Sequence, residues 1–109
     1  MTVTEAHLAL LSSRIAETIH PERIILFGSH ARGDAAPDSD VDLLVIVPES
    51  FSDRERWPKM QAIRKAIAHI RCSKDILLYS RDEVEQWRRS WNHVVAVALR
   101  EGRVIYGGP

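Results

Sequence analysis

The 109-residue sequence has few of the features that would indicate a membrane protein, a disulfide-linked protein or a strongly basic one. No apolar run approaches the roughly 20 residues that a membrane-spanning helix needs, so we expect no membrane association. The single cysteine, Cys72, cannot form an internal disulfide, and no cluster of cysteine and histidine has the spacing of a structural zinc site. Lys and Arg together number 15, as do Asp and Glu, so no overall positive charge attracts nucleic acid. We find no direct nucleic-acid-binding motif, although a local basic groove remains compatible with this composition.

The beginning of the chain also lacks a targeting signal. The segment MTVTEAHLALLSS has no basic stretch and carries Glu5 and His7, so we expect no signal peptide. Together with the low cysteine content, this predicts a location in the reducing cytoplasm. Hydrophobic residues make up 45% of the chain, which is enough for one core, and no repeat or linker interrupts it. We therefore predict a single domain over residues 1–109.

The spacing of apolar residues predicts helices and strands that follow one another along the chain. Three pairs have the spacing of a capping box at the start of a helix: Thr2 with Glu5, Ser52 with Glu55, and Ser80 with Glu83. In chain order we expect a helix over about 3–19, strands over 23–27 and 41–47, a helix after Ser52, a strand over 74–79, a helix after Ser80, a helix over 91–100 and an extended segment over 104–106. This order predicts an α/β (α+β) fold, a small mixed β-sheet flanked by helices.

Two acids stand at the beginning of the most apolar predicted strand. Asp40 and Asp42 flank Val41, and five apolar residues follow. Side chains two apart on a strand share one face, roughly 7 Å apart at the backbone, so the two carboxylates repel unless cations compensate them. Mg²⁺ takes such carboxylates together with substrate phosphates, and a two-ion site is compatible with this spacing. The alternative is structural: Asp40 caps a turn, and Asp42 is solvated at the end of the strand.

The loop before these acids has the features of a phosphate-binding turn. Gly28 ends the preceding strand and allows a tight turn, and Ser29 can offer its hydroxyl and its backbone N–H to a phosphate. Arg32 can bind a phosphate or a carboxylate. Ser39 either donates a hydrogen bond to the first carboxylate or caps the turn. His30 could touch a nucleotide, but the more ordinary interpretation is a residue with no ligand role.

The string GSHARGDAAPDSDVDLLV, from Gly28 onward, resembles the G-S-x10-D-x-D signature of the polymerase-β-like nucleotidyltransferase superfamily. Within it, the chain resembles the minimal nucleotidyltransferases, and the MntA-type antitoxins among them, over nearly its whole length. The resemblance implies a polymerase-β-like fold and a nucleotidyl transfer, with AMP from ATP as the expected case. It also implies Mg²⁺ as the cofactor, a helical HEPN-domain protein as the partner, and a site of three carboxylates.

Asp75 is the acid that best fits the third position of such a site. It precedes the apolar run Ile76-Leu77-Leu78, so it repeats the pattern of the first pair. The acids near Ser52 and Ser80 are explained by the N-termini of predicted helices, where free N–H groups favour negative charge. The alternative for Asp75 is an exposed strand end, paired with Lys74 or an arginine. We predict that Asp40, Asp42 and Asp75 are the metal-binding and catalytic residues, and that Gly28, Ser29, Arg32 and Ser39 bind the nucleotide.

Two functions are compatible with these residues. The first is an active enzyme that transfers a nucleotidyl group to a hydroxyl of a partner protein and so acts as the antitoxin of a HEPN toxin; a small-molecule acceptor is a variant of it. The second is a non-catalytic antitoxin or binding subunit that neutralises its partner by docking. Trp87 and Trp91 lie four apart and predict either core packing or an apolar docking patch. Larger relatives carry an additional helical domain, so we expect a partner, or a second copy in a homo-oligomer, to complete the site.

Overall fold

The computed structural model describes residues 3–107, which form a mixed sheet of four strands. In chain order the strands are β1 (Arg23–Phe27), β2 (Val41–Val47), β3 (Lys74–Ser80) and β4 (Arg103–Tyr106). Their order across the sheet is β3-β2-β1-β4. β1 pairs antiparallel with β2 and β4, whereas β2 and β3 are parallel. The sheet is therefore mixed, as predicted.

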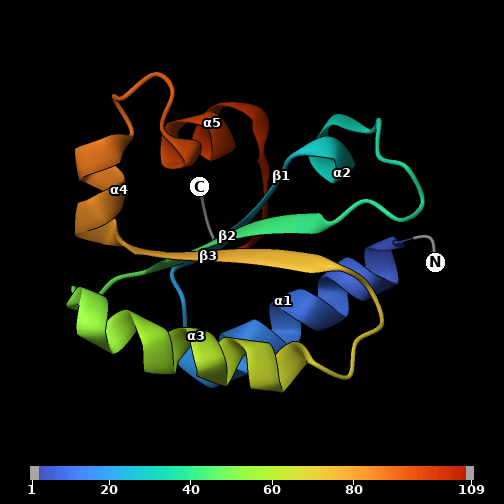
Figure 1. Cartoon of the computed structure of the whole chain (residues 1–109), viewed down its shortest axis with the longest axis horizontal. Coiled ribbons are helices and arrows are strands. Elements are labelled where there is room, and N and C mark those ends of the chain that lie inside the picture. The colour runs from blue at the N-terminus through green and yellow to red at the C-terminus, as the bar shows by residue number, and fades with distance from the viewer. Residues whose placement is uncertain (1–2, 108–109) are drawn as a thin grey trace.

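Helices cover both faces of this sheet (Figure 1). α1 (Glu5–Ile19) and α3 (Asp53–Ile67) lie on one face. The other face carries α2 (Ser29–Arg32), α4 (Arg81–Trp87) and α5 (Val94–Glu101). No helix within residues 3–107 is long and apolar enough to cross a membrane.

Strand β2 is apolar on both faces because helices cover both. Val41, Leu43 and Val45 belong to the core beneath α1 and α3. Leu44 and Ile46 point the other way, into a second core beside α4 and α5. The sequence of a strand that is covered on both faces is a continuous apolar run and does not alternate between apolar and polar residues. Asp42 lies near the start of this run. It shares the face of Leu44 and Ile46, because residues two and four positions apart on a strand point to the same side.

The predicted elements are confirmed in type and order, with corrections at their ends. The capping boxes at Ser52 and Ser80 are present. The first helix, however, is capped by Thr4 with His7, so the Thr2–Glu5 prediction is wrong for Glu5, and Thr2 lies outside the described residues. Thr4 is better placed because His7 Nδ1 accepts a hydrogen bond from the Thr4 backbone N–H at 3.0 Å.

Two other boundaries also differ from the prediction. The last helix begins at Val94, not at residue 91, because His93 caps it: its Nδ1 accepts the N–H of Val95 at 3.1 Å. The loop after Gly28 contains a short helix, α2, where we expected only a turn.

Lys74, at the start of β3, closes the C-terminal end of α3. Its Nζ donates hydrogen bonds to the carbonyl oxygens of Ile67 at 2.8 Å and Ile70 at 2.6 Å. The last carbonyl groups of a helix have no hydrogen-bond donor within the helix. The ammonium group of a lysine side chain is well suited to donate to them. Lys74 therefore ties α3 to the strand that carries Asp75.

We expect Lys74→Met to lower the free energy of unfolding by about 2 kcal/mol, because it removes two charge-assisted hydrogen bonds and leaves the carbonyls unpaired. Urea denaturation measures the difference. Lys65→Met is the control, since Lys65 is exposed on the same helix, and we expect a change within about 0.5 kcal/mol. Equal effects of the two substitutions would contradict the capping role.

Candidate active site

Pairing of the strands brings two of the predicted acids together. Asp42 lies opposite Phe27 of β1 on one side and opposite Asp75 of β3 on the other. Neighbouring strands are about 4.8 Å apart, and paired residues point to the same face. Asp40 precedes β2 and is exposed, as is Asp75, whereas Asp42 is half-buried. One end of the sheet therefore presents all three acids, on the side where α2 lies.

Gly28 brings the α2 turn directly against Asp42. Its φ is +76°, a conformation that favours glycine, and a Cβ added there would lie 2.2 Å from Asp42 Oδ2. No other residue type fits without moving the carboxylate. The backbone carbonyl of Gly28 accepts the N–H groups of Ala31 and Arg32, both at 3.1 Å, which closes the helical turn. The amides of Ser29 and His30 come before these in the turn and have no intrahelical acceptor.

The electrostatic environment of Asp42 disfavours its charged form. Burial raises the pKa of Asp42 above its usual value, and the negative charges of Asp75 and Asp40 raise it further. His30 and Arg32 act in the opposite direction, but the net shift is upward. The positive charges of His30 and Arg32 therefore do not offset the burial of Asp42 and the charges of the two other acids.

The chemistry of these donors suits a hard divalent cation. Carboxylate oxygens are the ligands that Mg²⁺ prefers, and a cation would offset both the burial and the neighbouring charges that raise the pKa of Asp42. Within residues 3–107, no three side chains of His, Cys, Asp or Glu lie close enough together to form a ligand set.

The ion-pair alternative for Asp75 does not hold in the described part of the chain. Lys74 directs its Nζ to α3 and not to Asp75. Among residues 3–107, no arginine or lysine forms an ion pair with Asp75. Asp75 is therefore an exposed acid at a strand end without an ion-pair partner among residues 3–107.

The structure gives Arg32 and Ser39 local partners. Arg32 Nε lies 3.3 Å from Asp34 Oδ2, and its Nη1 lies 3.7 Å from Glu101 Oε1. The carboxylate partner that the sequence allowed is therefore present, and the side chain remains exposed beside α2. Ser39 caps its turn, because its Oγ accepts the N–H of Ala36 at 3.0 Å. Of the two roles considered for Ser39, the structure contains the capping role.

His30 has a role that sequence reasoning missed. Its Nε2 lies 2.9 Å from the carbonyl oxygen of Ser39. A carbonyl oxygen can only accept, so Nε2 carries the proton and donates. This bond ties α2 to the residue before Asp40 and so joins the α2 turn to the loop of the first acid. The contact spans nine residues and has no local sequence signal.

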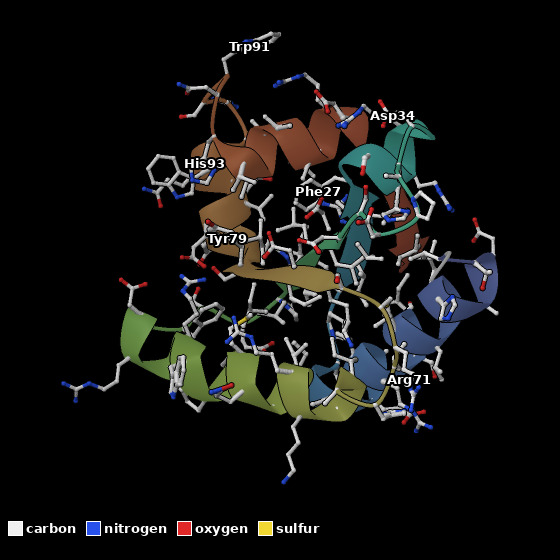
Figure 2. All side chains as sticks on the ribbon, turned by 45° about the vertical axis from the view of Figure 1, so that its right-hand side comes forward. Phe27, Asp34, Arg71, Tyr79, Trp91 and His93 are labelled. Carbon is white, nitrogen blue, oxygen red and sulfur yellow. The ribbon has the colours of Figure 1, made fainter. Side chains whose placement is uncertain are left out.

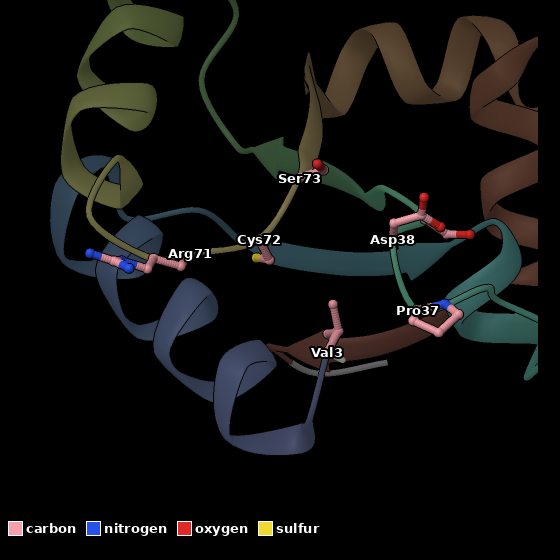
Figure 3. Close-up of a pocket in the computed structure, with 7 residues that line it drawn as sticks. Val3, Pro37, Asp38, Arg71, Cys72 and Ser73 are labelled. Atoms are coloured by element: carbon pink, nitrogen blue, oxygen red, sulfur yellow. The ribbon is translucent and has the colours of Figure 1, made fainter. Parts of the chain in front are cut away.

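A surface hollow and Cys72 lie outside this site. A hollow of about 320 Å³ beside the loop before Asp40 is lined by Val3, Pro37, Asp38, Ser39, Arg71, Cys72 and Ser73 (Figure 3). None of the three acids lines it. Cys72 is half-buried, and burial raises the pKa of its thiol.

The two neighbouring tryptophans lie in different environments, because Trp87 packs against other rings and Trp91 is exposed. Trp87 stacks on His93, with ring centres 4.4 Å apart and planes at 8°. His93 also meets the Tyr79 ring edge-on at 6.0 Å, so Trp87 belongs to the packing on the sheet. Trp91 is 77% exposed and points outward from the loop between α4 and α5 (Figure 2). Trp87 is the last residue of α4, whereas Trp91 lies in the loop that follows it.

Comparison with known proteins identifies the family. The family described as Nucleotidyltransferase domain matches residues 11–100. Because the match spans most of the chain, the chain belongs to the nucleotidyltransferase family of enzymes. A protein of Methanocaldococcus jannaschii named "Putative protein adenylyltransferase MJ0141" is 42% identical over 57 residues, which are 52% of this chain and 54% of that protein. The match thus spans about half the length of that relative.

Solved structures share the fold at low sequence identity. A "putative nucleotidyltransferase" from Sulfolobus solfataricus has a TM-score of 0.59 and 20% identity, covering 94% of this chain and 85% of that one. A toxin–antitoxin structure with AMP-PNP has a TM-score of 0.52 and 19% identity, covering 97% and 75%. A Shewanella oneidensis complex of tri-AMPylated HEPN toxin with MNT antitoxin has a TM-score of 0.51 and 16% identity, covering 91% and 71%. These structures confirm the predicted fold, and the family match confirms the resemblance to nucleotidyltransferases.

We expect Asp42→Asn to be more stable than the parent in EDTA at about pH 7, because the folded chain disfavours the charged form of Asp42. A carboxyl whose pKa is raised by folding binds its proton more tightly in the folded chain. The stability that this protonated carboxyl contributes is therefore lost as the pH rises through its pKa in the folded chain. The advantage of the asparagine variant should shrink at about pH 4, where Asp42 regains its proton. Urea denaturation at both pH values measures this, with Asp38→Asn as the control; a constant difference would contradict it.

We expect His30→Leu to raise amide hydrogen exchange over residues 34–40 by about fivefold, because a hydrogen bond worth about 1 kcal/mol is lost. His30→Gln retains an N–H donor of similar reach and should exchange like the parent. His69→Leu, at an exposed position of another loop, is the control. Unchanged protection of the loop in the leucine variant would show that the bond to Ser39 does not hold it.

Proposed function

We propose that this chain is a metal-dependent protein adenylyltransferase that moves AMP from ATP to a hydroxyl of a partner protein. The observation that carries the proposal is the end of the sheet where Asp42 and Asp75 lie in register, Asp40 is two residues away, and Gly28 brings the α2 turn against them. The name of the M. jannaschii relative and the AMP-PNP in a structure of the same fold support this choice of chemistry.

Each residue of the proposed site has a separate role in this reaction. The amides of Ser29 and His30 and the Ser29 hydroxyl hold the outer phosphates of ATP, with Arg32 beside them. The acceptor hydroxyl attacks the α-phosphorus, and the bond to pyrophosphate breaks as the new P–O bond forms. Asp75 is exposed and faces the same side as Asp42, so it can accept the proton that the hydroxyl loses.

Asp40, Asp42 and Asp75 would hold Mg²⁺ in this reaction, as a two-ion site. When bound, Mg²⁺ supplies the positive charge that phosphates and an ionising hydroxyl require. The fit rests on the all-oxygen donors and on the raised pKa of Asp42, which burial raises most and the charges of Asp75 and Asp40 raise further.

A HEPN-domain protein is the acceptor in this proposal. Support comes from the similar fold of the S. oneidensis complex, in which a tri-AMPylated HEPN toxin is bound to an MNT antitoxin. The second candidate is neutralisation by docking alone. It is favoured by the exposed Trp91, and it predicts that the acids can be removed without loss of the antitoxin effect.

We expect intact-mass spectrometry to detect AMP on the HEPN-domain partner after incubation of both purified proteins with ATP and Mg²⁺. Asp42→Asn should lower the rate of transfer at least about a hundredfold while the protein stays folded. Asp38→Asn, in the exposed turn before the site, is the matched control and should transfer at the parental rate.

Either of two results would contradict the enzyme. The Asp42→Asn variant could transfer AMP as fast as the parent. Alternatively, the partner could remain unmodified and yet be silenced equally by the parent and by Asp42→Asn, which would support docking instead.

A further inference from the structure

Trp91 and its neighbours form an exposed surface that the nucleotidyl-transfer site does not use. Trp91 is the most exposed of the exposed large hydrophobic residues among 3–107. It borders a hollow of about 320 Å³ on the outer side of α4 and α5. We call this the Trp91 surface; its residues are Arg88, Arg89, Trp91, Ala96, Leu99 and Arg100.

The indole ring is held in place although it is exposed. The Arg100 guanidinium lies 4.1 Å from its ring centre, and Arg100 Nη1 donates a hydrogen bond to the Trp91 carbonyl at 3.2 Å. The loop is also closed by backbone hydrogen bonds from Ser90 to Trp87 at 3.0 Å and from His93 to Ser90 at 3.1 Å. A ring held in this way loses little conformational entropy on binding, which favours a role in recognition.

The charge of this surface is local and of one sign. Three of its residues are arginines, and none is an acid. Arg88 pairs with Glu85 at 2.8 Å, whereas within residues 3–107 Arg89 has no ion-pair partner. The chain as a whole has a formal net charge of zero, so this concentration of positive charge is a property of the surface. Its complement is a surface that carries carboxylates around an apolar side chain.

We propose that the Trp91 surface docks an acidic protein surface with an apolar residue at its centre, and that this surface belongs to the protein that receives AMP. The proposal rests on the function proposed above. Tryptophan and arginine dominate binding energy at protein interfaces, and arginine pairs with carboxylates in a planar, specific geometry. α5 also meets the catalytic side: Glu101 lies 3.7 Å from Arg32 of α2. A partner seated on α5 is therefore on the same side of the sheet as Asp42 and Asp75 (Figure 1).

Two other occupants fit less well. A second copy docked by two-fold symmetry would set the same arginines against one another. A nucleic acid needs cations along the track of its phosphates. Here the cations surround an apolar floor of Ala96 and Leu99 instead.

Calorimetric titration of the HEPN-domain partner into the chain tests the proposal. We expect Trp91→Ala to weaken the Kd at least about thirtyfold, and Arg89→Glu about tenfold with a weaker salt dependence. The matched controls are Trp57→Ala and Arg54→Glu. Trp57 is 64% exposed and Arg54 is exposed, and both lie on α3, across the sheet. Neither control should change the Kd.

Failure of the docking proposal is distinguishable from failure of the enzyme. Asp42→Asn should abolish transfer and leave the Kd unchanged, whereas Trp91→Ala should leave binding of AMP-PNP unchanged. Loss of partner binding in Trp91→Ala supports the docking surface even if no AMP is transferred.

The docking proposal is overturned if the parent does not bind the partner, or if Trp91→Ala and Trp57→Ala bind it equally. It is also overturned if sedimentation finds a dimer of the chain that Trp91→Ala dissociates. A single-stranded RNA oligonucleotide that binds the parent but not Arg89→Glu, while partner binding persists, overturns it in favour of a nucleic-acid surface.

Discussion

The close approach of the Gly28 backbone to the Asp42 carboxylate is the constraint on which the site depends. β1 and β2 are antiparallel, and Phe27 lies opposite Asp42, so the chain must turn immediately beside that carboxylate. Only a residue without a Cβ can do so, because a Cβ would lie 2.2 Å from Asp42 Oδ2. The same turn begins α2, whose first amides have no intrahelical acceptor. One glycine thus joins the carboxylate strand to the α2 turn.

The fold holds these acids where they are electrostatically unfavourable. The charges of Asp75 and Asp40 add to burial in raising the pKa of Asp42. The strand that carries Asp42 continues into residues that are buried on both faces, and their apolar burial offsets the repulsion at its head. Acids at the head of an otherwise apolar strand are the kind of local conflict that functional sites carry. The rigid sheet keeps the acids in register, while their exposed ends remain open to a ligand.

The two faces of the sheet have different roles. α1 and α3 pack against one face, with α3 tied to β3 through Lys74. The other face combines a core near α4 and α5 with the acids near α2. The contact between Arg32 and Glu101 links α2 to the end of α5. The acids and the loop that carries Trp91 therefore lie on the same side of the sheet, opposite α1 and α3 (Figure 1).

Local patterns in the sequence were enough for much of the fold and for the acids of the candidate site. Apolar runs and capping boxes predicted the order of the elements, since those signals depend on residues within one or two turns. The same reasoning selected Asp40, Asp42 and Asp75, because each stands at the beginning of a buried strand. The proposed roles of these acids and of Gly28, Ser29, Arg32 and Ser39 stay predictions.

The tertiary structure determined the contacts between distant residues, which local sequence patterns cannot predict. The parallel register that sets Asp75 beside Asp42 joins residues 33 positions apart. The hydrogen bond from His30 to Ser39 depends on how a loop folds back on α2. Trp87 and Trp91 lie four apart in the sequence, but α4 ends at Trp87, so the Trp87 ring packs on His93 while Trp91 is exposed in the following loop. Sequence determined which residues could form the site, and long-range pairing decided which of them meet, because register is set by the packing of whole strands.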